Sequence, residues 1–117
     1  METMKDHLDQ FKRAAGTMAK TMPSLWSAWN QFGQAAMAEG VLPKRTKELV
    51  AIGIAIHSRC TYCIGLHVRS AMRLGISREE IMEVAGVAML MGGGPSMTYL
   101  TEVLAAIEMV EQDTADG

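Results

Sequence analysis

The sequence predicts an all-α protein, a single-domain bundle of about six helices. Its 117 residues fit one domain, and 49% of them are hydrophobic, which is enough to build one core. The apolar residues recur at steps of three and four, the spacing of a helix, and regular strand alternation is absent. Only 5% of the residues are aromatic, so we expect the eleven methionines and the alanines to fill the core. We assign one domain to residues 1–117, with its core over about 20–110 and a flexible tail over 112–117.

Charge and hydropathy exclude several classes of protein. The net charge is -2 and acidic and basic residues are mixed along the chain, which disfavours a nucleic-acid partner. No run of about 18 apolar residues could span a membrane, and METMKDHLDQFKRAAG lacks the apolar core of a signal peptide. We therefore expect a cytoplasmic protein with no membrane partner. In that compartment a C-x-x-C pair is more often redox-active or metal-binding than structural.

The first two helices are expected over 3–21 and from Pro23 to about Glu39. The first has a narrow apolar stripe and reads as a covering helix without chemistry. Pro23 suits the first turn of the second helix, and a glycine at position 40 would end it. Two tryptophans on this helix, at 26 and 29, fit large core or interface residues better than the lining of a ligand pocket.

The third and fourth helices are expected over 43–57 and from residue 59 or 60 to residue 74. A polar break, His57-Ser58-Arg59, separates their apolar runs and permits a sharp turn. Gly75 gives the fourth helix a C-terminal stop.

The fifth and sixth helices lie on either side of a glycine-rich break. Ser77 and Glu80 form a capping box that opens the fifth helix, which covers 81–91. The sequence GGGP at 92–95 reads as a hinge rather than a phosphate loop, because it lacks the Walker pattern and follows no strand. A sixth helix then runs to about Glu111, before a polar, frayed tail, EQDTADG.

The third and fifth helices are apolar on nearly every side. A chain of this length buries only part of its surface, so a lone monomer would leave some of these apolar residues in water. We therefore expect a homo-oligomer.

The stretch ELVAIGIAIHSRCTYCIGLH, residues 48–67, reads as a thiol redox site. Cys60 lies at the expected N-terminus of the fourth helix and Cys63 in its first turn, where the helix dipole favours thiolates. Cys63 and His67 are four residues apart, on one helical face, so His67 can accept the Cys63 proton directly or through a water.

Glu48 is the candidate carboxylate that would orient His67. Along one continuous helix the two residues would be roughly 28 Å apart, so contact requires a sharp turn near Ser58. The alternative is a solvated glutamate in the first turn of its helix.

Two other interpretations of the cysteines stay open. His57, Cys60, Cys63 and His67 are four zinc-type ligands, although zinc sites usually draw ligand pairs from separate segments. The cysteines could also be inert core thiols. A thioredoxin fold is disfavoured, because its motif needs a βαβ context.

This stretch resembles the core of the AhpD-like proteins, the alkylhydroperoxidase branch of the carboxymuconolactone decarboxylase family. The family pattern is a glutamate, a C-x-x-C pair twelve residues later and a histidine four residues after the second cysteine. Glu48, Cys60, Cys63 and His67 match it position by position. The later MGGGPSMTY is similar to a Gly-Gly-Pro turn of the family, and the resemblance spans roughly residues 20–110. One departure is Tyr62, which stands where AhpD proper has a histidine.

The resemblance implies an all-α fold, obligate oligomers and, for short members, hexamers. It also implies a thiol-dependent hydroperoxidase or disulfide reductase that uses a peroxide and a dithiol reductant and needs no cofactor or metal. Cys63 would be the attacking thiolate, Cys60 the resolving thiol, His67 the base and Glu48 its orienting carboxylate. Cys60 is the second candidate for the nucleophile. The alternative function is a metal-binding or redox-regulated structural oligomer without turnover.

Overall fold

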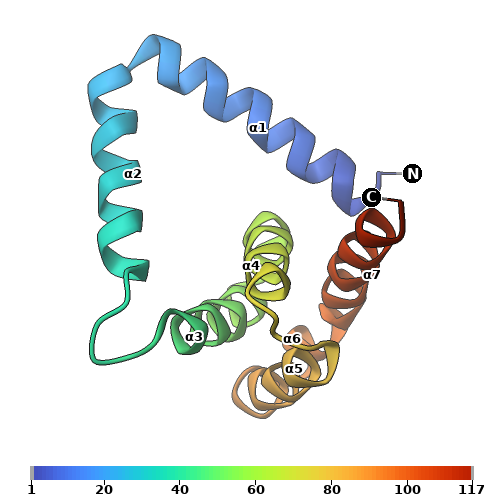
Figure 1. Cartoon of the computed structure of the whole chain (residues 1–117). Coiled ribbons are helices and arrows are strands. Elements are labelled where there is room, and N and C mark those ends of the chain that lie inside the picture. Colours follow the sequence, from blue (N-terminus) through green and yellow to red (C-terminus); the bar gives the residue numbers. More distant parts are fainter. Residues whose placement is uncertain (1, 117) are drawn as a thin grey trace.

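The structure is a computed structural model that describes residues 2–116. Within this range the chain forms seven helices and no strand, which confirms the predicted all-α fold (Figure 1). In chain order the helices are α1 (Met4–Thr21), α2 (Pro23–Met37), α3 (Lys44–His57), α4 (Thr61–Arg73), α5 (Arg78–Gly92), α6 (Gly94–Thr98) and α7 (Leu100–Asp116). Gly117, the end of the expected tail, lies outside the described residues.

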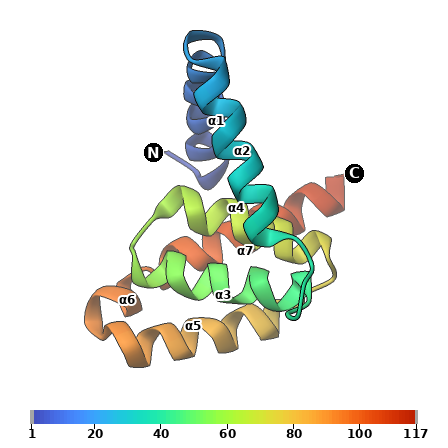
Figure 2. The same cartoon turned by 90° about the vertical axis from the view of Figure 1, so that its left-hand side faces the viewer.

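Helices α3 and α4 form the centre of the fold. α3 packs against α4 and α5, and α4 packs against α7 and α1. The N-terminal part of α1 packs against α4 and α7, and its Met4 and Leu8 side chains are buried there. From this contact α1 leads away from α7 and α2 leads back toward α3, so that the two helices form an arm (Figures 1 and 2). None of the helices within residues 2–116 is long and apolar enough to cross a membrane.

The core is built from isoleucine, valine and alanine, and the expectation that methionine would fill it was wrong. The largest fully buried apolar side chains are Ile52, Ile56, Ile64, Ile81, Ile107, Val68 and Val103. Among the methionines in the described part of the chain, only Met4 is buried. Branched side chains lose little rotamer freedom on burial, whereas the more flexible Met72, Met82 and Met109 are only partly buried and pack against this core.

Local capping explains several helix boundaries. The predicted capping box at α5 is confirmed: the Ser77 hydroxyl accepts from the Glu80 N–H, and the Glu80 carboxylate accepts from the Ser77 N–H, both at 3.1 Å. Thr3 and Asp6 make an equivalent box at α1. Gly75 follows Leu74, the C-cap residue of α4, and has a φ of 87°, which a glycine adopts without steric cost. It therefore stops α4 as expected.

The end of α2 differs from the prediction. The helix stops at Met37 rather than near Glu39, and Gly40 is not its left-handed cap. Instead, the Lys47 ammonium on α3 donates to two carbonyl oxygens at the end of α2, those of Ala36 at 3.0 Å and Ala38 at 2.6 Å. A cation at a helix C-terminus satisfies its free carbonyls and interacts favourably with the dipole.

Replacing Lys47 with methionine should therefore loosen α2 from α3. We expect a loss of about 1 kcal/mol in the free energy of unfolding, since Met keeps the length of the side chain but removes both hydrogen bonds. Urea unfolding measures the loss, and hydrogen exchange should locate it in α2. Lys44→Met is the matched control, and equal effects of both variants would contradict this role for Lys47.

The glycine-rich segment is more helical than expected. α5 continues through Gly92, and the chain breaks only at Gly93, whose φ is 68°. The one-turn helix α6 follows, because proline is tolerated in the first turn of a helix. α7 also passes the expected end near Glu111 and reaches Asp116, with the Gln112 side-chain amide donating to the Asp116 carboxylate at 3.1 Å.

Candidate functional site

The turn between α3 and α4 brings the two halves of the candidate site together. Ser58 ends α3, and Arg59 adopts a left-handed conformation with a φ of 56°. The Arg59 N–H donates to the Ile56 carbonyl at 3.0 Å, and the Cys60 N–H donates to the Ala55 carbonyl at 3.1 Å. These two bonds form a Schellman motif in which arginine occupies the position that glycine usually takes. The chain therefore reverses within two residues, as the polar break permitted.

Cys60 ends this turn and also caps the next helix. It is the N-cap residue of α4, and its Sγ accepts a hydrogen bond from the Cys63 N–H at 3.2 Å. Cys60 and Cys63 are joined by a disulfide, with their Cα atoms 5.2 Å apart. Both sulfur atoms thus lie at the positive end of the α4 dipole, where a thiolate is stabilised once the bond is reduced.

Glu48 and His67 are in direct contact across the α3–α4 packing. The Glu48 Oε2 lies 2.9 Å from the His67 Nδ1. The Glu48 side chain is only 6% exposed, whereas that of His67 is 32% exposed. An ionised carboxylate can only accept, so Nδ1 carries the hydrogen and Nε2 keeps a free lone pair. This contact replaces the alternative of a solvated Glu48 and leaves His67 with an atom that can take a proton.

The half-buried Cys63 lies on the same face of α4 as His67, one turn before it. Residues four apart on a helix have Cβ atoms roughly 6 Å apart. The four residues predicted from sequence therefore lie in one region: a disulfide pair at the start of α4, a histidine one turn on, and a buried carboxylate behind it. Such an arrangement can move a proton from a thiol to an imidazole whose cation is stabilised by the carboxylate.

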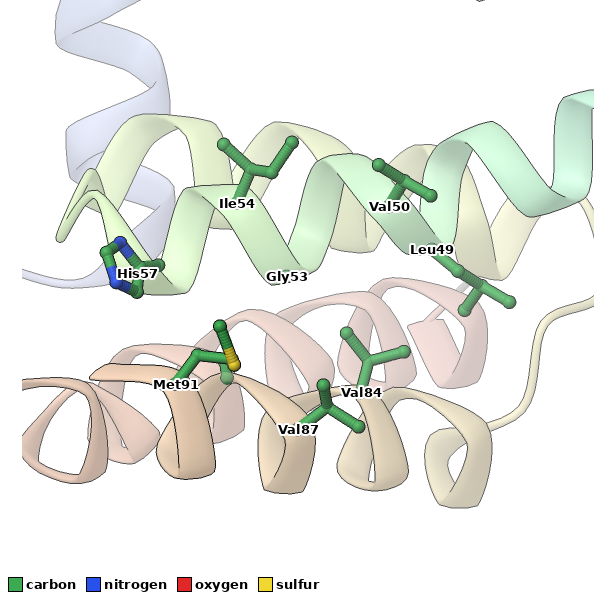
Figure 3. A pocket seen from close by; sticks show the side chains of 9 residues that line it. Leu49, Val50, Gly53, Ile54, His57, Val84, Val87 and Met91 are labelled. Carbon is green, nitrogen blue, oxygen red and sulfur yellow. The ribbon is translucent and has the colours of Figure 1, made fainter. Parts of the chain in front are cut away.

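His57 lies away from this group. It lines an apolar groove of about 490 Å³ between α3 and α5, together with Val50, Ile54, Val87 and Met91 (Figure 3). Among the described residues, no three His, Cys, Asp or Glu side chains are grouped so as to hold a metal ion. The four zinc-type ligands considered from the sequence therefore do not converge.

Tyr62, between the two cysteines, packs against α1. Its ring lies edge-on to His7, with centroids 5.6 Å apart, and tilted against Phe11 at 5.8 Å. The first helix therefore covers the start of α4, as a covering helix should, and Tyr62 is the residue that it covers.

A cavity beside the Glu48–His67 pair was not predicted from the sequence. It has a volume of about 770 Å³ and lies between α2 and the α3–α4 pair. Trp29, Phe32 and Met37 of α2 line one side, and Glu48 and His67 lie on the other. The sequence signal for this cavity is the run 23–37, which includes no charged residue.

Several known proteins are similar to this chain in sequence, and two solved structures are similar to it in fold. The pattern of the carboxymuconolactone decarboxylase family matches residues 23–106. An uncharacterized protein of Cupriavidus necator is 33% identical over 102 residues, covering 87% of this chain and 90% of its own. An uncharacterized protein of the Paracoccus denitrificans cox locus is 33% identical over 98 residues, covering 84% of this chain and 88% of its own.

Two solved structures superpose closely. A carboxymuconolactone decarboxylase family protein of Legionella pneumophila has a TM-score of 0.84 and 38% identity, covering 89% of this chain and 94% of its own. One from Thermotoga maritima, for which a role in an antioxidative response has been suggested, has a TM-score of 0.83 and 22% identity, with 95% of both chains covered. By sequence and by fold, this chain belongs to the carboxymuconolactone decarboxylase family.

Proposed function

We propose that the protein is a thiol-dependent peroxidase that reduces organic hydroperoxides, with Cys63 as the nucleophile. The observation that carries the proposal is the 2.9 Å contact between a buried Glu48 and His67, one turn from a cysteine pair at a helix N-terminus. An activated thiolate needs a base beside the nucleophile and a third group that orients the base. The antioxidative role suggested for the Thermotoga maritima protein of the same fold agrees with this chemistry.

The first step oxidises Cys63. The His67 Nε2 takes the thiol proton, and the thiolate attacks the terminal oxygen of the hydroperoxide. The S–O bond forms as the O–O bond breaks, which leaves a sulfenic acid on Cys63 and an alkoxide. The alkoxide takes the proton from His67 and leaves as an alcohol, while Glu48 stabilises the imidazolium through Nδ1.

The second and third steps restore the dithiol. The Cys60 thiol attacks the sulfenic sulfur, releases water and closes the Cys60–Cys63 disulfide. A dithiol reductant then opens it by exchange and leaves as a disulfide itself. The same exchange, run with another protein or small disulfide as the oxidant, makes a disulfide reductase, which is the second activity that this pair supports.

Consumption of an organic hydroperoxide in the presence of a dithiol tests the proposal. Purified wild-type protein should consume the peroxide catalytically, and omission of the dithiol should limit the reaction to one equivalent per disulfide formed. Loss of two hydrogens from the intact mass should accompany that equivalent. A protein that keeps both thiols reduced in excess peroxide would instead be the structural oligomer considered from the sequence.

We also propose that the protein acts as a homo-oligomer, with a hexamer as the expected state. Two separate apolar faces support this, the α3–α5 groove of Figure 3 and the exposed face of α2. One self-complementary face gives a dimer, and a second, different face allows a larger closed assembly. The cytoplasmic location and the absence of a cofactor remain predictions.

A further inference from the structure

Helix α2 has the composition of a buried helix but lies exposed. Residues 23–37 include no charged side chain, yet none of them, all described by the structure, is buried. Leu25, Trp29 and Phe32 are 53%, 61% and 67% exposed, and the rings of Trp29 and Phe32 stack with centroids 6.1 Å apart. Aromatic surface that lacks charge is typical of the centre of a protein interface.

The neighbouring helix α1 makes a useful comparison. It is also largely exposed, but its sequence MKDHLDQFKRAAGTMAKT places lysine, aspartate and arginine along its outer side. The exposed side of α1 thus carries charged residues, whereas the exposed side of α2 carries none. Both helices belong to the same arm, so the difference concerns what each face meets (Figure 2).

The apolar face of α2 looks onto the candidate site. Trp29, Phe32 and Met37 line the cavity of about 770 Å³ whose other side carries Glu48 and His67. The His67 side chain lines this cavity and is 32% exposed to water. The proton-accepting histidine is therefore the solvated member of an otherwise buried pair.

The chain exposes more surface than a compact monomer of its length. The chain exposes 7597 Å². A compact monomer of this length would expose about 6,200 Å², so roughly 1,400 Å² is in excess. A stable interface takes about 800 Å² from each partner, which the excess exceeds.

We propose that a second copy of this chain packs its α2 against this α2 and fills the cavity, so that the Glu48–His67 pair is closed from water only in the pair of subunits. A twofold axis brings identical patches together, and a helix without charge meets its copy without repulsion. Gly33 lies on this face with nothing within 4 Å of an added Cβ, which leaves space for close approach. The role given to the pair rests on the proposed function.

Closure changes the chemistry of the site. Removing water from around His67 strengthens its interaction with the Glu48 carboxylate, because the local dielectric constant falls. It also shields a sulfenic acid on Cys63 from further oxidation until Cys60 reaches it. The α2 contact is thus part of the active site as well as part of the assembly.

The test places a charge on the apolar face of α2. Phe32→Asp should lower the mass measured by light scattering at least twofold, with helical content unchanged by circular dichroism. His67 should then react several-fold faster with diethyl pyrocarbonate, followed by peptide mass spectrometry. Gln31→Asp, which adds the same charge on the other side of the helix, should leave both values at those of the wild type.

A wild-type protein that is monomeric, or a Phe32→Asp variant with unchanged mass or unchanged His67 reactivity, would overturn the proposal. If Phe32→Asp loses helical content, Leu25→Asp on the same face provides the same test. Neither measurement depends on turnover. A wild-type protein that assembles as expected but consumes no peroxide would therefore contradict only the proposed function.

Discussion

Replacing Cys63 with serine is expected to abolish hydroperoxide turnover, with a loss of at least about 10³-fold in kcat/KM. Serine keeps the size of the side chain and the first turn of α4, but its hydroxyl is not ionised by a neighbouring histidine to a comparable extent. The measurement is the rate of hydroperoxide loss with excess dithiol.

Cys60→Ser is the matched control for this prediction, because it removes the other sulfur of the same disulfide. It should still react with one equivalent of hydroperoxide at a rate close to that of the wild type, and then stop. If Cys63→Ser reacts with the first equivalent and Cys60→Ser does not, the two roles are reversed. The N-cap position of Cys60 makes that the competing assignment.

Replacing Glu48 with glutamine is expected to slow the reaction with hydroperoxide by about 10- to 100-fold. Glutamine has the shape of glutamate and its oxygen can still accept from the His67 Nδ1 at the observed 2.9 Å. It lacks the negative charge that stabilises the imidazolium, so His67 accepts the thiol proton less readily. The thiolate should then form less easily. The pH profile of the alkylation rate of the reduced protein should therefore shift to higher pH.

Glu83→Gln controls for the change in net charge, because Glu83 is an exposed carboxylate on α5. His67→Gln should reproduce the Glu48→Gln effect, and the double variant should add little, since both residues act on the same proton. A Glu48→Gln variant with the alkylation profile of the wild type would contradict the coupling between Glu48 and Cys63.

Much of the fold followed from local sequence. Capping at Ser77, the stop at Gly75 and the break before Cys60 each depend on a few neighbouring residues, so the sequence indicated them correctly. The end of α2 did not follow, because it depends on Lys47 from another helix. A contact across the fold has no local signal, and a glycine at position 40 gave a plausible local one instead.

The sequence indicated which residues to consider for the candidate site, but not how they would lie relative to one another. The spacing of Glu48, Cys60, Cys63 and His67 indicated which residues to consider, and the contact between Glu48 and His67 depends on the turn at Arg59. A non-glycine residue in the left-handed conformation is uncommon, so sequence allowed a turn there without specifying its geometry. The cavity beside α2 needed the placement of a whole helix.

The most direct test of the central claim is the intact mass of reduced Cys60→Ser protein after brief exposure to one equivalent of an organic hydroperoxide. We predict a gain of one oxygen, located on Cys63 by peptide analysis and removed by dithiol, beside a loss of two hydrogens in the wild type. An unchanged mass in both proteins, with both wild-type thiols still open to alkylation, would contradict the assignment of Cys63 as a peroxide-reactive thiolate.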